Sequence, residues 1–98
     1  MKYKSYRDAS DRLTVAVEGM SSLAYRLVSW KVKRKFKLKR CGDFNKTFDE
    51  KFQEYEKDGT NVSIDWDIWS GFTVTALEPE SEKIVNEIGK YLEEKYNP

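Results

Sequence analysis

Two aspartates, Asp65 and Asp67, are the residues whose type and spacing best suit chemistry. They lie in the stretch NVSIDWDI, residues 61–68, where apolar and polar residues alternate. On a strand the two carboxylates would project from the same face, about 7 Å apart. A hard cation such as Mg²⁺ could bind the pair, with Glu78 as a third ligand. Alternating aspartates are also ordinary on a solvent-facing strand surface, and we favour this structural interpretation.

The rest of the composition argues against an enzyme. The 98 residues include no histidine, which removes the commonest general base and most zinc sites. Cys41 is the one cysteine, so thiolate clusters and an internal disulfide are excluded. Neither of the common glycine-rich phosphate motifs is present. We therefore predict a non-catalytic protein without a cofactor or a bound metal.

A second pattern, WKVKRKFKLKR at residues 30–40, places a lysine at every second position. This period of two predicts a long strand with one cationic face and one apolar face. Arg34 interrupts the apolar face, so we expect a bend or a bulge near the middle of the strand. The cationic face consists of Lys31, Lys33, Lys35, Lys37 and Lys39. The apolar face consists of Val28, Trp30, Val32, Phe36 and Leu38.

This lysine row, flanked by Arg26 and Arg40, predicts a surface that binds an acidic partner. The partner would be the backbone of a nucleic acid or an acidic protein surface. Because the alternation assigns Trp30, Phe36 and Trp66 to the core, the row lacks aromatic rings on which bases could stack. The row does not require a ligand, since exposed lysines also deter edge-to-edge aggregation and could pair with acids of the same chain.

Charge is divided sharply along the chain, although the net charge is only +1. Residues 1–18 carry four bases and three acids, residues 19–42 carry eight bases and no acid, and residues 43–98 carry six bases and fourteen acids. The three segment charges are therefore +1, +8 and −8. Such a division indicates either a polyanion-binding surface or two parts of one fold that complement each other.

The first half of the chain leaves one choice between helix and strand open. Apolar residues at helical spacing favour a helix over about residues 10–25, whereas the alternation within 13–17 fits a strand. Further on, Thr47 and Glu50 form a capping box, which predicts a short helix that ends at Gly59.

The second half is more regular. Two strands, 61–68 and 72–77, are joined by a three-residue loop, Trp69-Ser70-Gly71, in a register that keeps their apolar residues on one face and both aspartates on the other. Pro79 then opens a terminal amphipathic helix that reaches about Tyr96.

Together these elements predict one α+β domain over residues 1–98. We expect a two-layer sandwich in which helices pack on one face of a mostly antiparallel sheet of three or more strands, in the order α-β-α-β-β-α. If the N-terminal segment is a strand instead, the arrangement shifts toward a ferredoxin-like fold.

Trp69 suggests an alternative function, because it would lie in the hairpin loop without a strand partner. There it either folds back on aromatic neighbours or anchors a protein partner, as in an inhibitor or adaptor that also uses a sheet edge. A metal-dependent enzyme is less favoured. The sequence also allows a homodimer through a sheet edge. It has neither a secretory signal nor an apolar run long enough for a membrane helix, so we expect a soluble cytoplasmic protein without a membrane partner.

Overall fold

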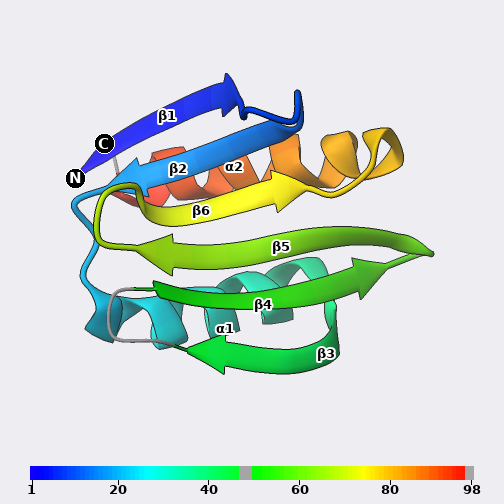
Figure 1. Ribbon diagram of the computed structural model, residues 1–98, viewed down its shortest axis with the longest axis horizontal. Helices are drawn as coiled ribbons and strands as arrows, with labels where there is room; N and C mark the ends of the chain where they lie inside the picture. Colours follow the sequence, from blue (N-terminus) through cyan, green and yellow to red (C-terminus); the bar gives the residue numbers. More distant parts are fainter. Residues whose placement is uncertain (47–49, 97–98) are drawn as a thin grey trace.

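One six-stranded antiparallel sheet forms the centre of the computed structural model, which describes residues 1–46 and 50–96 but not the side chains of 43–46. Its strands lie in the order β1-β2-β6-β5-β4-β3 (Figure 1). The elements in chain order are β1 (Lys2–Arg7), β2 (Leu13–Glu18), α1 (Ser22–Phe36), β3 (Lys39–Lys46), β4 (Glu50–Lys57), β5 (Thr60–Asp67), β6 (Gly71–Ala76), a short 3₁₀ helix η1 (Pro79–Ser81) and α2 (Glu82–Tyr96).

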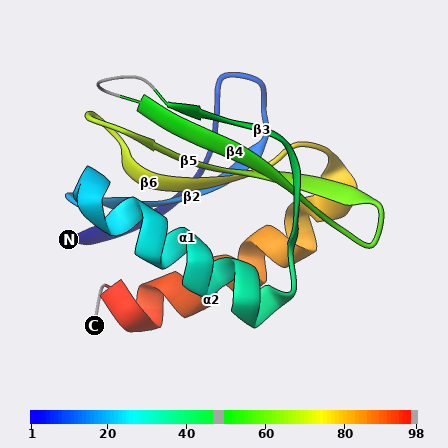
Figure 2. The ribbon, with the colours of Figure 1, turned by 90° about the horizontal axis from the view of Figure 1, so that it is seen from below.

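Both helices lie on the same side of this sheet, as Figure 2 shows. Helix α2 packs against β1, β2 and β6, and α1 packs against β5. The core between the helices and the sheet is built mainly from β-branched and aromatic residues, the types that pack well on a pleated surface. Its members include Val15, Val17, Tyr25, Val28, Val32, Val62, Ile64, Phe72, Val74, Val85, Ile88 and Leu92.

The segment predicted to be a lysine-bearing strand is mostly a helix, so that prediction was wrong. Ser21 caps the helix, because its hydroxyl accepts the Ala24 amide at 3.3 Å, and Lys37 ends it in the left-handed conformation with φ 55°. The buried side of α1 repeats at helical spacing and consists of Tyr25, Val28, Ser29 and Val32. Alternating lysines hid this period, because lysine is accommodated at any exposed helix position.

The sheet topology explains why a helix is needed here. Strand β2 is second from one edge of the sheet, whereas β3 forms the opposite edge (Figure 1). The chain must therefore cross under the sheet between them, and α1 makes this crossing while covering β5. A strand at 28–39 could not make that connection.

A second predicted helix, from Thr47 to Gly59, was also wrong. Thr47 lies outside the described residues, but Glu50–Lys57 is strand β4. Asp58 and Gly59 both have positive φ, 52° and 81°, and join β4 to β5 as a two-residue hairpin turn. The Asp-Gly pair is a strong hairpin signal that the helix-cap interpretation of Gly59 overlooked.

At the N-terminus the favoured helix over 10–25 was wrong and the strand alternative was right, since β2 occupies Leu13–Glu18. Strand β1 was not predicted at all. Five of its six residues are exposed, so its sequence lacks the apolar alternation that marks a half-buried strand. It is held instead by antiparallel pairing with β2 along its whole length.

The C-terminal half confirms the predicted strands and terminal helix. Trp66 pairs with Phe72 and Ile64 with Val74, which keeps the apolar residues of β5 and β6 on one face. The loop is Ile68-Trp69-Ser70, one residue earlier than expected, so each pairing shifts by two residues and the faces are unchanged.

No described helix is long and apolar enough to cross a membrane.

The α+β class is confirmed, but the arrangement is not the expected one. The observed order, β-β-α-β-β-β-β-α, differs both from α-β-α-β-β-α and from a ferredoxin-like fold. The difference comes from five segments: α1 replaces a strand, β2 and β4 replace helices, and β1 and β3 are additional strands.

Gly71 occupies a tight position next to the backbone of β2, where a larger residue should destabilise the sheet. Its φ is +75°, and an added Cβ would collide with the Val17 carbonyl oxygen and lie 3.1 Å from Glu18 Cα. Gly59 has a similar φ of +81° but open space around it. We expect Gly71→Ala to lower the free energy of unfolding by about 3 kcal/mol, and Gly59→Ala by only about 1 kcal/mol. Urea unfolding followed by circular dichroism measures both, and equal losses would contradict the account.

Candidate functional site

A cleft of about 350 Å³ lies between α1 and strands β3 and β4. This volume falls within the range of small-ligand pockets. Within the part of the chain whose side chains are described, its lining combines three cations with three aromatic rings and includes no carboxylate. The lining residues are Tyr25, Arg26, Ser29, Trp30, Lys33, Arg40, Gln53 and Tyr55.

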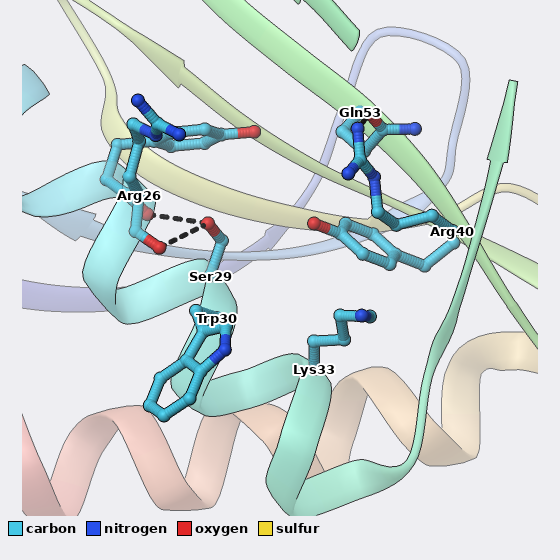
Figure 3. Close-up of a pocket in the computed structure, with 8 residues that line it drawn as sticks. Arg26, Ser29, Trp30, Lys33, Arg40 and Gln53 are labelled. Carbon is cyan, nitrogen blue, oxygen red and sulfur yellow. Dashed lines mark hydrogen bonds between the residues drawn. The ribbon is translucent and has the colours of Figure 1, made fainter. Parts of the chain in front are cut away.

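Helix α1 supplies one wall of the cleft. Arg26, Ser29, Trp30 and Lys33 are spaced i, i+3, i+4 and i+7, so helical geometry places them on one side of the helix. Figure 3 shows all four projecting from α1, with Lys33 directed toward the strand side that carries Arg40. The core-facing side of the same helix is adjacent, and Ser29 belongs to both because it is buried and also lines the cleft. Its hydroxyl donates to the Tyr25 carbonyl at 2.7 Å.

Strands β3 and β4 supply the other wall. Arg40 lies on β3 next to a break in register between Cys41 and Asn45. Gln53 on β4 is fully buried, and its amide donates to the carbonyls of Cys41 and Gly42 at 3.0 and 3.3 Å. The Gln53 side-chain oxygen accepts from Arg40 at 3.4 Å. Gln53 therefore supports the irregular stretch of β3 and positions Arg40 beside it.

The gap between the two walls is fixed by contacts from β4 and β5 to the helix. Lys51 donates to the Ser22 carbonyl at 3.1 Å near the start of α1, and Lys57 donates to the Phe36 carbonyl at 2.7 Å at its end. A lysine at a helix C-terminus also interacts favourably with the helix dipole. Between these ends the Tyr25 hydroxyl donates to the Ile64 carbonyl at 2.6 Å.

The cleft cations have no acidic partner among the described side chains. The ion pairs found among the described side chains involve Lys4, Arg7 and Arg12 instead. Burial raises the pKa of the Tyr55 hydroxyl, and the positive charge of Arg40 and a hydrogen bond with Ser29 oppose that rise. The cleft therefore combines an uncompensated positive charge with a partly desolvated aromatic floor.

The structure brings together three of the predicted binding residues, Arg26, Lys33 and Arg40, and separates the others. Lys35 points toward α2, where its ammonium lies 5.4 Å from the ring centre of Tyr91. The remaining three, Lys31, Lys37 and Lys39, are exposed outside the cleft lining. Consecutive strand residues face opposite ways, so Lys39 and Arg40 lie on opposite faces of the sheet. The continuous cationic strand face does not exist.

The expectation that Trp30 lies in the core was also wrong. The strand pattern assigned it to the core, but half of its surface is exposed, and it lines the cleft. The guanidinium of Arg34 lies 5.1 Å from its ring centre, at cation–π distance. Sequence reasoning also missed Ser29, Gln53 and Tyr55. Helical spacing from Arg26 would have identified Ser29 and Trp30, whereas nothing local in the sequence identifies Gln53.

The predicted aspartates lie on the opposite, helix-free face of the sheet. Asp67 accepts the backbone amides of Trp69 and Ser70 at 2.9 and 2.6 Å, which stabilises the β5–β6 turn. Asp65 accepts a hydrogen bond from the Ser63 hydroxyl.

Glu78 is engaged elsewhere, because its carboxylate accepts the Asn61 amide at 2.7 Å. Among the described residues, no group of three or more His, Cys, Asp or Glu side chains is arranged to hold a metal ion.

Trp69 is in the β5–β6 loop, as expected, and 79% of its surface is exposed. It does not fold back into the core.

Comparison of the chain with known protein families, curated proteins and solved structures found no match.

Asp65 should make stability depend on pH. Burial raises the pKa of its carboxyl to about 6, with further upward contributions from Glu50 and Asp67, while the Ser63 hydrogen bond opposes them. The folded state therefore holds this proton more tightly than the unfolded state, where the pKa is about 4. The contribution of Asp65 to the free energy of unfolding should fall by about 2 kcal/mol as pH rises from about 4 to about 6.

The test compares urea unfolding of the wild type with Asp65→Asn across this pH range. The variant should lack the Asp65 contribution and should exceed the wild type in stability at neutral pH. Glu54→Gln, which changes an exposed carboxylate on the neighbouring strand, is the matched control. An identical pH profile for Asp65→Asn and the wild type would show that Asp65 titrates normally.

Proposed function

We propose that this protein is a non-catalytic binding domain that takes an acidic partner at the cleft between α1 and β3–β4. The single observation that carries the proposal is the meeting of Arg26, Lys33 and Arg40 around one concave site whose lining, among the described side chains, includes no carboxylate. Cations in a partly dry cleft attract an anion more strongly than the same cations spread over a flat surface.

The distribution of acids over the fold supports this proposal. Strands β4 and β5 place their alternating acids on the face away from the helices, as the pairing of Glu50 with Asp67 indicates. Those carboxylates therefore lie away from the cleft cations, while the α2 glutamates Glu87 and Glu94 lie beside Lys35 near the end of α1. An acidic partner would be drawn to the helix side of the molecule and repelled from the opposite face.

A protein-binding inhibitor or adaptor that uses Trp69 is the second candidate, favoured by the exposure of this tryptophan. In that case Trp69 would anchor the partner, and the sheet edges β1 and β3 would offer unpaired backbone groups for it or for a second copy of the chain. The two candidates predict different effects of salt on binding, since an apolar anchor is insensitive to salt.

A cytoplasmic location is our expectation from the sequence.

The proposal predicts that Arg26→Glu with Lys33→Glu lowers affinity for acidic probes at least about tenfold. The probes are a single-stranded oligothymidine and a polyglutamate peptide, titrated at low and at physiological salt. Binding of the wild type should weaken steeply as salt rises, as screening of a charge-driven interaction requires.

The matched control reverses two exposed lysines outside the cleft, Lys2→Glu with Lys83→Glu. Both pairs of substitutions change the net charge from +1 to −3, since each reversal removes two units. The control should therefore retain most of the affinity. If both pairs weaken binding equally, or if neither probe binds the wild type at low salt, the cleft is not the site.

A further inference from the structure

Helix α1 carries a second apolar surface that the fold does not use. Leu23, Leu27 and Trp30 are spaced i, i+4 and i+7 and form a stripe on the solvent side of the helix. Their exposed fractions are 90%, 54% and 50%. The core is filled from the other side of α1, so these three side chains contribute little to folding. Exposed apolar clusters of this kind mark interaction surfaces.

This stripe is continuous with the cleft. Trp30 belongs to both, because it lies at the boundary between the exposed stripe and the wall that carries Arg26 and Lys33. Helix α1 contains five bases and no acid, and the Arg34 guanidinium lies over the Trp30 ring. A partner on this surface would therefore meet a short apolar ridge with cations on its flanks and a cationic cleft beside it.

We propose that the acidic partner is a protein segment, an acidic amphipathic helix whose apolar side chains cover Leu23, Leu27 and Trp30 and whose carboxylates reach Arg26 and Lys33. This inference rests on the proposed function and specifies its partner. Two amphipathic helices pack together through apolar rows at i, i+4 and i+7, which is the spacing that the stripe presents. Aromatic and arginine residues such as Trp30 and Arg34 are typical of the contacts that dominate such interfaces.

Other occupants fit the stripe less well. A phosphate backbone offers nothing apolar to Leu23 and Leu27, and bases stack on aromatic rings rather than on leucines. A flat lipid surface would contact the ridge without entering the cleft. A second copy joined through α1 would place five bases against five bases, and the acidic sheet face of a second copy presents carboxylates and threonines in place of an apolar stripe.

The test uses a synthetic peptide of about 18 residues, roughly five helical turns, with leucines at i, i+4, i+7 and i+11 and glutamates elsewhere. A scrambled peptide of the same composition is its control. Affinities come from fluorescence anisotropy. We expect the patterned peptide to bind at least about tenfold more tightly than the scrambled one. Leu23→Ser with Leu27→Ser should remove that preference while leaving the circular dichroism spectrum unchanged, because both side chains are exposed.

A second pair of substitutions, Ile68→Ser with Trp69→Ser, changes exposed apolar residues of the β5–β6 loop and should leave peptide binding intact. Loss of binding in this pair alone would move the docking site to the loop and overturn the inference. So would failure of the patterned peptide to bind, or tighter binding of oligothymidine or of phosphatidylserine vesicles than of the peptide.

The leucine and charge variants also separate the two proposals. If Arg26→Glu with Lys33→Glu abolishes binding of acidic probes while the leucine pair has no effect, the cleft binds acids but the apolar stripe is not involved. If neither pair of substitutions changes binding, both proposals fail.

Discussion

The docking of α1 on β5 determines which side chains of the helix face the core, the cleft and the solvent. The Tyr25 hydroxyl donates to the Ile64 carbonyl at 2.6 Å, in a buried environment where a hydroxyl without an acceptor would cost about 1–3 kcal/mol. Val28 and Val32 are buried on the same side of the helix. Together these contacts set the rotation of α1 about its own axis. A different rotation would bury the cations or expose the core, so these contacts together determine which residues face the cleft.

The same constraint separates the charges of the molecule. Residues 19–42, with eight bases and no acid, become α1 and the start of β3, while many of the acids that follow lie on the far side of the sheet. The complementation that one interpretation of the sequence allowed is therefore partial: Glu87 and Glu94 of α2 lie beside Lys35, whereas the acids of β4 and β5 face away from the cleft. The molecule keeps a positive helix side and a negative sheet face, which is the arrangement expected of a domain that orients an acidic partner.

Which helices and strands could be predicted from the sequence depends on how clear their apolar period and turn residues are. Strands β5 and β6 and helix α2 were predicted because their apolar periods are unambiguous and lie on segments with clear turn signals. Helix α1 was missed because lysines at alternate positions imitate a strand, and β4 was missed because Gly59 suits a helix end as well as a hairpin. Of the site, Arg26, Lys33 and Arg40 were in the predicted set. Gln53, the partner of Arg40, is brought to it only by strand pairing between β3 and β4.

The central claim is that the helix side of the molecule, around the cleft of α1 and β3–β4, is where an acidic partner binds. Its most direct test is an amide chemical-shift titration of the isotope-labelled protein with the patterned acidic peptide. The account predicts that the largest shifts map to α1 from Leu23 to Arg34 and to the strands beside Arg40 and Gln53, with β1 and the Asp65 face unchanged. Shifts concentrated on the Asp65 face or on the Trp69 loop, with α1 unaffected, would contradict it.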